Sequence, residues 1–396
     1  MPDYRVVISS TTDTGMAAAR KLFAPDHLVF SWPLDFTFAV RRALNRLRPD
    51  LVVLMEGEVW PNFLAACGRR GIPVVMVNGR MSPRGLRWRK LGPFARKVFG
   101  RLAAVGVQDE SYSAMFQGLG VEAGKIQITG MLKYDTAEVA DKLAGQEALA
   151  AAMGIAPDDR LIVAGGTGPG EEKMILEVWP ELEARHPRAR LAIVPRKPER
   201  FDEVARLIES MGLPLVRRSQ RPDGGREEEK KEEEKEKKKE KEEDAGKMPA
   251  IREGKMPSLR AAVVLGDTMG ELRKFYALAS CVFVGRSLVP MGGSDMIESA
   301  ALGKATAFGP HTFNFPQADE LARHRCARVA DAKELAAQLD RWLSDEKAAA
   351  EAGRAAQDYV RSQQGATRRN VEMICRALHR VPALRPGDIA TQGIVD

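Results

Sequence analysis

The chain has 396 residues, of which 44% are hydrophobic, so it is long enough for two or three globular domains with cores of their own. Its formal net charge of +7 favours a partner that carries negative charge, such as a nucleic acid, an anionic lipid or a phosphorylated sugar. Four scattered cysteines without a Cys-x-x-Cys pair indicate neither a disulfide framework nor a zinc site, and no apolar run approaches the roughly 20 residues that span a bilayer.

The first third of the chain alternates short apolar segments with amphipathic ones. The apolar segments predict six strands, and the segments between them predict helices, for example at residues 15–23 and 62–70. This alternation is typical of a parallel sheet with helices on both faces, so we expect a Rossmann-like N-terminal domain over residues 1–135. A polar, alanine-rich linker is expected at residues 136–160. The six strands are expected at residues 5–9, 27–31, 50–55, 73–78, 103–108 and 126–129.

A second α/β series is expected over residues 161–380, ending in a helical stretch. A run of almost pure Glu and Lys interrupts this series. Because such a run cannot bury apolar surface, residues 218–260 are interpreted as an insert in a loop. Residues 381–396 are expected to form a tail, and two doubly wound domains in tandem predict ligand binding at the carboxyl ends of their strands. The strands are expected at residues 161–164, 191–194, 262–265, 281–284 and 305–308.

Two acidic residues, Glu56 and Glu58, directly follow a strand that we expect to be buried, residues 51–55. Carboxylates at the carboxyl end of a strand face the crevice of an open α/β sheet. They are equally typical of a helix start, with Pro61 in the first turn. The residues alone favour neither interpretation; Glu56 suits a site better and Glu58 suits a helix start better.

Four turns of the second domain follow expected strands, at residues 165–172, 195–200, 266–271 and 292–298. Each alone has an ordinary interpretation, such as a surface turn or a helix N-cap formed by Ser294 or Asp295. Together, at the strand ends of one domain, they indicate a nucleotide cleft. In such a cleft Arg196 or Arg200 would pair with a phosphate, and Glu298 would hold ribose hydroxyls.

A basic segment at residues 80–101 lies in a stretch without any acidic residue, residues 59–108. Its cations are interleaved with Trp88, Phe94 and Phe99, a combination that suits a membrane interface with anionic groups. The same combination would equally suit nucleic acid, and the plainer interpretation is a solvated helix face. The cations are Arg80, Arg84, Arg87, Arg89, Lys90, Arg96, Lys97 and Arg101.

Seven motifs in this order resemble those of the Kdo transferases, which move 3-deoxy-D-manno-octulosonic acid (Kdo) from CMP-Kdo to the lipid A precursor. The resemblance covers nearly the whole chain except the charged insert and the ends. It implies a GT-B fold, two Rossmann-like domains with a cleft between them, and inverting transfer that needs CMP-Kdo as donor but no metal or other cofactor. The motifs are residues 56–62, 78–82, 132–135, 165–172, 195–200, 266–272 and 309–315.

The resemblance also implies roles for single residues. Transition-state stabilisation would fall on Glu56 and Lys133. An Asp stands at position 295, where the family usually has Asn, which adds negative charge near a phosphate. The family works at the cytoplasmic face of the inner membrane, so residues 80–101 are expected to meet an anionic membrane surface and no nucleic acid. Contacts with CMP would fall on Pro195, Arg196, Met269, Gly270, Glu271, Asp295, Met296, Ile297 and Glu298.

The general base of the family, a Glu in a Ser-x-Gly-Glu turn after the first strand, has no counterpart in this sequence. By resemblance, Met1 aligns with the start of the family's second strand, and loss of the central first strand would expose apolar edges on its two neighbours. We therefore expect little or no transferase activity from this chain. The intact downstream motifs favour a coding start set too far downstream over a genuine remnant.

Two alternatives remain at this point. One is another GT-B enzyme acting on a nucleotide sugar, for which protection of the second domain by UDP-sugars but not by CMP would be diagnostic. The other is a non-catalytic protein that uses the basic segment to bind anionic lipid or nucleic acid. Salt-sensitive binding to liposomes or DNA without sugar transfer would identify it.

Overall fold

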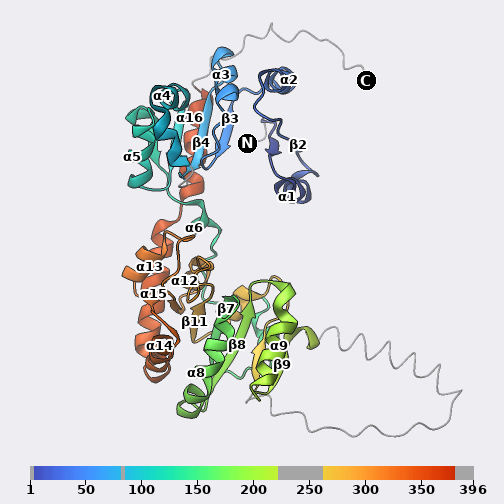
Figure 1. The fold of residues 1–396 in the computed structure, drawn as a ribbon, viewed down its shortest axis with the longest axis vertical. Coiled ribbons are helices and arrows are strands. Elements are labelled where there is room, and N and C mark those ends of the chain that lie inside the picture. Colours follow the sequence, from blue (N-terminus) through green and yellow to red (C-terminus); the bar gives the residue numbers. More distant parts are fainter. Residues whose placement is uncertain (1–3, 82–84, 222–261, 380–396) are drawn as a thin grey trace, which may run out of the picture. The chain divides into compact units, whose positions relative to one another are not determined.

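The computed structural model describes residues 4–81, 85–221 and 262–379 (Figure 1). Most of the charged insert, the expected tail and three residues of the basic segment, 82–84, lie outside the described residues. The chain forms two compact units, one of Met1–Asp135 with Gln364–Asp396 and the other of Thr136–Gln363. Both units contain only parallel sheets combined with helices, as the alternating pattern predicts.

The division into units differs from the boundaries expected from sequence at two places. The expected linker, residues 136–160, lies in the second unit, where α7 (Gln146–Ala152) packs against α11 (Leu272–Leu278) and buries Leu149. The last helix, α16 (Ala366–His379), lies in the first unit and packs against its sheet. Amphipathic patterns show that a helix buries one face, but they do not reveal which sheet receives that face.

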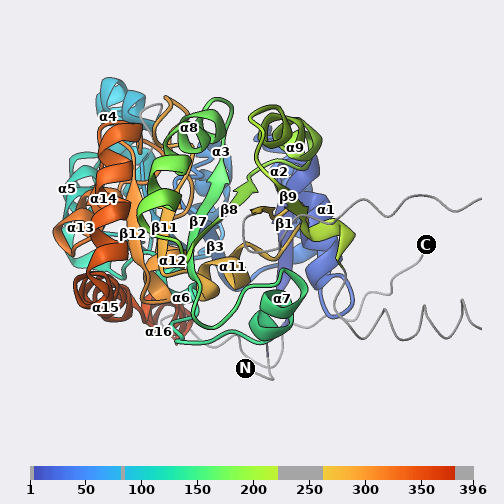
Figure 2. The ribbon, with the colours of Figure 1, turned by 90° about the horizontal axis from the view of Figure 1, so that it is seen from below.

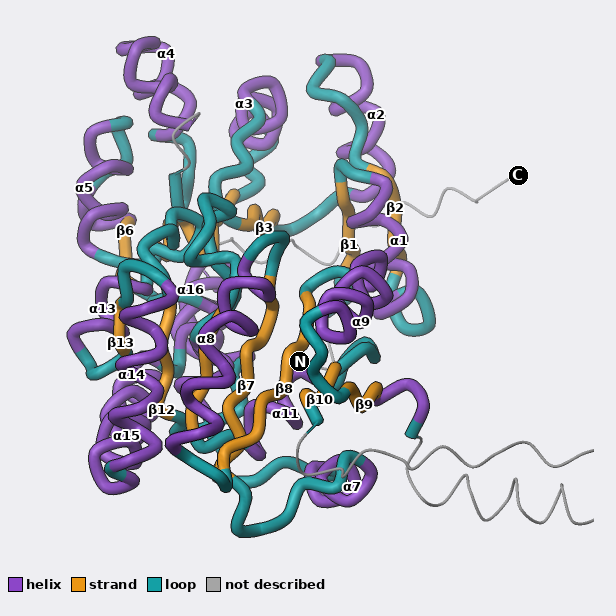
Figure 3. The backbone as a smooth tube through the Cα atoms, turned by 60° about the horizontal axis from the view of Figure 1, so that its bottom comes forward, coloured by secondary structure: helices purple, strands orange, loops and turns teal. Residues whose placement is uncertain are grey.

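The first unit carries its six strands in two separate sheets (Figure 3). β1 (Val7–Ser10) pairs with β2 (Leu28–Ser31). The other sheet has the order β3-β4-β5-β6, formed by β3 (Val52–Met55), β4 (Val74–Gly79), β5 (Ala104–Val107) and β6 (Ile126–Ile128). The helices are α1 (Asp13–Phe23), α2 (Thr37–Leu47), α3 (Pro61–Arg69), α4 (Gly92–Phe99), α5 (Glu110–Gly118) and α6 (Leu132–Thr136).

The expectation that residues 51–55 form a buried strand is wrong in part. Val53 is 39% exposed and Met55 is 50% exposed, because alternate side chains of a strand share one face, and this face of β3, which pairs only with β4 among the described residues, is not covered. Val7 on β1 is likewise exposed. Side chains rather than a ladder join the two sheets: Trp32 after β2 packs edge-on against Phe63 of α3, with ring centroids 4.7 Å apart.

The second unit has one continuous seven-stranded sheet of order β13-β12-β11-β7-β8-β10-β9. Helices α8, α9 and α14 neighbour one another on one face, and α11 and α12 lie on the other (Figure 2). Apart from the half-buried Arg160 at the start of β7, its central strands are buried along their whole length, as expected for parallel strands covered on both faces. The strands are β7 (Arg160–Thr167), β8 (Ala189–Pro195), β9 (Leu215–Arg217), β10 (Val263–Leu265), β11 (Cys281–Val284), β12 (Ala305–Phe308) and β13 (Ala327–Arg328). The remaining helices are α8 (Glu171–Arg185), α9 (Phe201–Ser210), α12 (Ile297–Ala301), α13 (Ala318–Arg323), α14 (Ala332–Ser344) and α15 (Glu346–Gln363).

Strand order in this sheet creates a switch point. The chain passes from β7 to β8 on one side and returns through β11 on the other side of β7. In open α/β sheets ligands bind outside the carboxyl ends of the strands at such a point. The turns after β7, β8, β10 and β11 all lie at this carboxyl edge, since the sheet is wholly parallel.

Candidate functional site

The carboxyl edge of the first unit's larger sheet carries the polar cluster around Glu56. The Glu56 carboxylate accepts hydrogen bonds from Arg80 Nε (2.9 Å) and Nη2 (2.7 Å), and both side chains are nearly half exposed. Glu56 itself has a φ of 58°, a left-handed conformation that is uncommon for residues other than glycine. Strained backbone of this kind is frequent at functional sites, so the geometry favours Glu56 as a site residue.

Glu58 does not cap the start of α3, which is the role that its position suggests. It is exposed and accepts a hydrogen bond from Trp60 Nε1 at 3.2 Å, ahead of α3. The free amides of α3 are capped by Asp35, whose carboxylate accepts from Asn62 N (2.9 Å) and Phe63 N (2.8 Å). Asp35 was missed in the sequence, because no local pattern links a cap to a helix 27 residues further along the chain.

Asn78, near the end of β4, connects this strand with the end of β5 and the start of α6, beside Glu56. Its side-chain oxygen accepts from Gln108 Nε2 (3.0 Å) after β5 and from Leu132 N (3.3 Å) at the start of α6. The half-buried Lys133 follows directly on α6. Glu56 and Lys133 therefore both lie at the carboxyl edge of the same four-stranded sheet.

Asp135, in the same motif as Lys133, has a structural role. Its carboxylate accepts hydrogen bonds from Gly365 N (2.7 Å) and Thr367 N (2.5 Å) and so caps α16. Burial acts to raise the pKa of Asp135, but the hydrogen bonds from Thr367, Gly365 and Ala366 outweigh it, and the pKa lies below its usual value.

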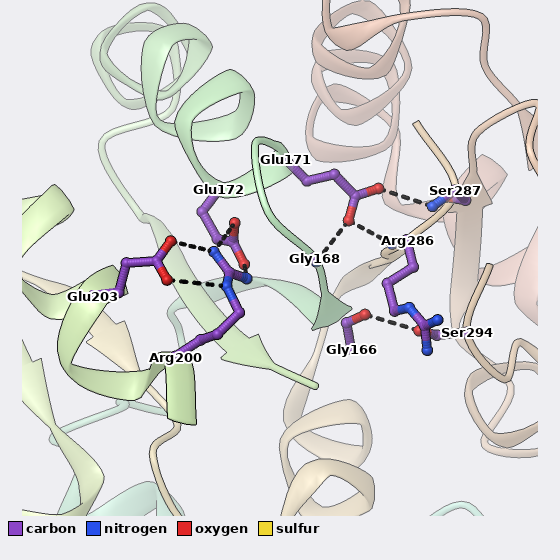
Figure 4. Close-up of polar contacts among 9 residues, drawn as sticks. All are labelled: Gly166, Gly168, Glu171, Glu172, Arg200, Glu203, Arg286, Ser287 and Ser294. Carbon is purple, nitrogen blue, oxygen red and sulfur yellow. Dashed lines mark hydrogen bonds and ion pairs between the residues drawn. The ribbon is translucent and has the colours of Figure 1, made fainter. Parts of the chain in front are cut away.

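In the second unit, the glycine-rich turn after β7 already holds an anion that belongs to the protein. The fully buried Glu171 carboxylate accepts hydrogen bonds from the backbone N–H of Gly168 (2.9 Å), Arg286 and Ser287 (2.8 Å) (Figure 4). It also accepts from the N–H of Leu288 at 2.9 Å. Glycine-rich turns that open a helix often bind an external anion through their amides. The Gly168 amide is instead satisfied by Glu171.

The turn after β8 separates its two arginines into different roles. Arg200 is buried and forms a bidentate pair with Glu172 at 2.6 and 3.1 Å, supplemented by Glu203 (Figure 4). Burial acts to lower the pKa of Arg200, but these carboxylates raise it, so Arg200 stays charged and occupied. Arg196 is exposed at the strand end, with its N–H donating to Thr167 O at 3.1 Å. Of the two, Arg196 remains available to a phosphate.

The turn after β10 presents Met269 and Gly270 as exposed residues, while the carboxylate of Glu271 is engaged. Arg218 donates to Glu271 at 2.9 and 3.1 Å. Burial acts to raise the pKa of Glu271, but the bonds from Arg218 and Thr268 lower it overall. Sequence reasoning missed Arg218, which stands at the edge of the expected insert.

The segment after β11 forms a close approach to the end of β7. Ser294 Oγ donates to Gly166 O at 2.8 Å, and Asp295 caps Ile297 N at 3.0 Å. Met296 and Ile297 are fully buried, so a ligand would meet their main chain rather than their side chains. Glu298 is half-buried.

Tyr276 was not singled out in the sequence, yet its hydroxyl lies at the centre of these segments. A Cβ at Gly165 would stand 2.4 Å from this hydroxyl, so only glycine fits there. The hydroxyl is buried without a hydrogen-bond partner in the described structure. Burial raises its pKa well above the usual value, and the charges of Glu298 and Asp295 add to this while that of Arg196 opposes it. The close approach to Gly165 places this hydroxyl at the carboxyl end of β7.

Comparisons with known proteins point to one family. A family model described as 3-deoxy-D-manno-octulosonic-acid transferase (kdotransferase) matches residues 1–136. A 3-deoxy-D-manno-octulosonic acid transferase of Bordetella pertussis is 34% identical over 93% of this chain and 80% of its own length. One of Haemophilus influenzae is 28% identical over 96% and 82%, respectively. A glycosyltransferase of Rickettsia africae superposes with a TM-score of 0.58 over 95% of this chain and 91% of its own at 14% identity, which shows a shared fold.

Proposed function

The chain belongs to the Kdo transferases, a family of glycosyltransferases, and we propose that its second unit binds CMP-Kdo for Kdo transfer in lipopolysaccharide biosynthesis. The observation that carries this proposal is the exposure and position of the Arg196 guanidinium. This guanidinium is exposed at the carboxyl end of β8, on a loop fixed at both ends, beside the switch point of the sheet. A planar guanidinium pairs with phosphate oxygens in a bidentate manner.

The remaining donor contacts are proposed on the family resemblance and the exposure of each residue. Gly270 has a φ of 86° and carries no side chain, so a nucleotide can approach its backbone closely. Glu298 and Asp295 are suited to ribose hydroxyls by their carboxylates. The other proposed lining residues are Pro195, Met269, Glu271, Met296 and Ile297, with Met296 and Ile297 acting through their main chain.

Transfer itself is proposed to use Glu56 and Lys133 of the first unit. Departure of CMP builds negative charge on its phosphate, which cationic side chains offset. The sugar then becomes oxocarbenium-like, and a carboxylate such as that of Glu56 stabilises it. A hydroxyl of the lipid A precursor would attack directly and invert the anomeric centre, a step that requires a general base, for which this sequence has no counterpart to the family's glutamate. The family resemblance implies that no metal or other cofactor takes part.

Calorimetric titration of the chain with CMP tests the donor site. We expect saturable binding that weakens at least about tenfold in Arg196→Ala, since a charge-assisted hydrogen bond contributes about 1.5–3 kcal/mol. The matched control is Lys197→Ala, which removes the adjacent exposed cation. Absence of saturable binding at millimolar CMP would contradict the donor-site proposal. Tighter binding of UDP than of CMP would favour a different nucleotide-sugar enzyme.

We also propose that the chain works at the cytoplasmic face of the inner membrane, held peripherally through residues 80–101. None of the described helices has the length and apolar character required to cross a bilayer. Within the segment, Leu91 and Phe94 are half-exposed, and Phe94 stacks on Trp88 with centroids 6.3 Å apart. Exposed apolar groups among cations match the interface of an anionic membrane. Apart from Arg80, which pairs with Glu56, the exposed cations among the described residues of the segment are Arg87, Arg89, Lys90, Arg96 and Lys97.

Co-sedimentation with phosphatidylglycerol vesicles tests the membrane contact. Each basic residue near an anionic surface contributes about 1 kcal/mol, so the double charge reversal Arg96→Glu, Lys97→Glu should weaken binding at least about 30-fold. The control is the same reversal at the exposed Arg20 and Lys21 of α1. Equal binding of both variants would contradict the assignment to residues 80–101. Binding to duplex DNA but not to vesicles would identify a nucleic-acid surface instead.

A further inference from the structure

Two adjacent carboxylates, Glu171 and Glu172, begin helix α8 and are both fully buried. Figure 4 shows that they point to different loops, Glu171 to the loop after β11 and Glu172 to the loop after β8. We propose that these two glutamates are positioning residues. They hold the loops after β8 and β11 in the relative position that the phosphate of the donor requires. The inference rests on the proposed function and deepens it.

Glu171 gathers four backbone amides from two segments around one carboxylate. Three of them come from consecutive residues, Arg286 to Leu288, and Arg286 has a left-handed φ of 59°. This tight turn directs successive N–H groups to one point, a concave arrangement that binds anions. Without the carboxylate these buried amides would lose their partners, so Glu171 determines the conformation of the loop.

The loop at residues 286–288 in turn holds two further segments. Arg286 O accepts from Gly293 N at 2.7 Å, which fixes the segment that leads to Asp295 and Glu298. Ser287 accepts from His311 N (2.9 Å) through its carbonyl and from Gly309 N (2.8 Å) through its hydroxyl. Through this loop, Glu171 therefore fixes the segment that carries two proposed donor contacts, Asp295 and Glu298, which it does not itself touch.

Glu172 fixes the other loop through Arg200. The bidentate pair anchors the loop four residues beyond Arg196, and the bond from Arg196 N to Thr167 O anchors it at its start. Arg196 is thus held at both ends of a short loop while its side chain stays exposed. Since neighbouring residues of a helix point about 100° apart, one helical start can serve loops on two sides.

The first turn of α8 suits two buried carboxylates for a general reason. The N-terminus of a helix carries positive potential, which stabilises anions placed in its first turn. Each carboxylate also has donors of its own, four amides for Glu171 and a guanidinium for Glu172. Neither needs a ligand to be satisfied, so the two loops are arranged before the donor arrives, and less ordering is required on binding.

The experiment compares CMP with cytidine, which lacks the phosphate, by titration calorimetry on the full chain and on Glu171→Gln and Glu172→Gln. If the pair positions phosphate-contacting loops, each variant should bind CMP at least tenfold more weakly and cytidine almost unchanged. The matched control is Glu177→Gln on the exposed side of α8, which should bind both as the parent does. Because Glu171→Gln could fail to fold, Glu172→Gln and Arg200→Lys provide a second, independent arm.

The outcomes separate this inference from the proposal beneath it. Equal weakening for CMP and cytidine would mean a general structural role and would overturn the positioning role, as would unchanged CMP affinity in a folded Glu171→Gln or Glu172→Gln. If the parent chain itself bound no CMP, the proposed function would fail and this inference with it. A parent that binds CMP while the variants do not discriminate between the two ligands leaves the donor site intact and removes only the inference.

Discussion

Strands β3 and β11 look alike in sequence and differ in surroundings. β3 reads Val-Val-Leu-Met and β11 reads Cys-Val-Phe-Val, both four apolar residues ahead of a polar turn. β11 is buried throughout because helices cover both faces of its sheet, whereas β3, which pairs with β4 alone among the described residues, exposes every second side chain, as a strand does when one face is uncovered. An apolar run thus predicts a strand, but the cover on each face of the sheet decides how much of it is buried.

The comparison extends to the two units. In the second unit one ladder of hydrogen bonds runs through all seven strands. In the first unit the ladder stops between β1 and β3, and the capping contact of Asp35 and the packing of Trp32 on Phe63 connect the pieces. The second unit is therefore expected to resist local opening, and the first to open more easily at its free edges.

Amide hydrogen exchange should show the largest difference. Val52 and Glu56 donate to the β4 side, so by the period of a strand the N–H groups of Val53 and Met55 face the open edge. They should exchange at least about 100-fold faster than Val282, which has strands on both sides. Residue-resolved exchange by NMR measures this. Equal protection at Val53 and Val282 would show that the edge of β3 is covered in solution.

A matched pair of side-chain truncations should show the next largest difference between the units, in the free energy of unfolding. Val282→Ala removes methyl groups that are fully buried, and Val53→Ala removes methyl groups that are partly in water already. We expect the first to lower the free energy of unfolding of its unit by about 2 kcal/mol and the second by less than about 1 kcal/mol. Urea unfolding followed through resonances of each unit distinguishes them, and similar losses would contradict the difference in burial.

The contact of Asp35 with α3 should be worth about 1 kcal/mol, as for other N-caps. Asp35→Ala is also expected to free the β1–β2 piece, because this cap joins segments 27 residues apart. Its counterpart in the second unit is Asp331→Ala, which removes the local cap of α14 at Glu334 N. Limited proteolysis should accelerate within the first 36 residues of Asp35→Ala, while cleavage in Asp331→Ala should stay near α14. Equal local effects would argue against a connecting role for Asp35.

Acid should weaken the cap of α16 by the smallest amount, below about 1 kcal/mol. The pKa of Asp135 is lowered in the folded chain, so its contribution is present above the ordinary carboxyl pKa near 3.8 and is lost as the pH falls through the lowered value. In Asp135→Asn the contribution should be missing at neutral pH. The stabilities of the parent and the variant should therefore converge as the pH falls below the lowered pKa of Asp135. A constant difference from neutral to acid pH would rule out titration of this carboxylate as the cause.

Sequence reasoning located most elements but few of their partners. Residues 27–31 and 281–284 lie within one residue of β2 and β11, because apolar runs and turns are local signals. The buried pair of Arg200 with Glu172 joins residues 28 apart, and nothing local distinguishes Arg200 from Arg196 as the occupied arginine. The same holds for Glu171, three of whose four amide partners lie more than 100 residues downstream.

The family motifs were located by resemblance, and the structure separates them by environment. Lys133 and Asp135 stand two residues apart in one motif, yet Asp135 caps a helix while Lys133 lies at the sheet edge. Tyr276 lies outside every motif, and its apolar neighbours in the sequence gave no indication of a hydroxyl among the proposed donor contacts. Motif membership therefore does not separate structural residues from those available to a ligand.

The location of α16 has a consequence for how the protein is made. Its amides at Gly365 and Thr367 bind Asp135 across 230 or more residues, and the helix packs on β4 and β5 of the unit that leaves the ribosome first. During translation, one side of the sheet of that unit stays uncovered until nearly the whole polypeptide has been synthesised. The second unit has all its described strands by residue 328 but also needs α14 and α15, which end at Gln363 just ahead of α16, so both units depend on helices that are synthesised late.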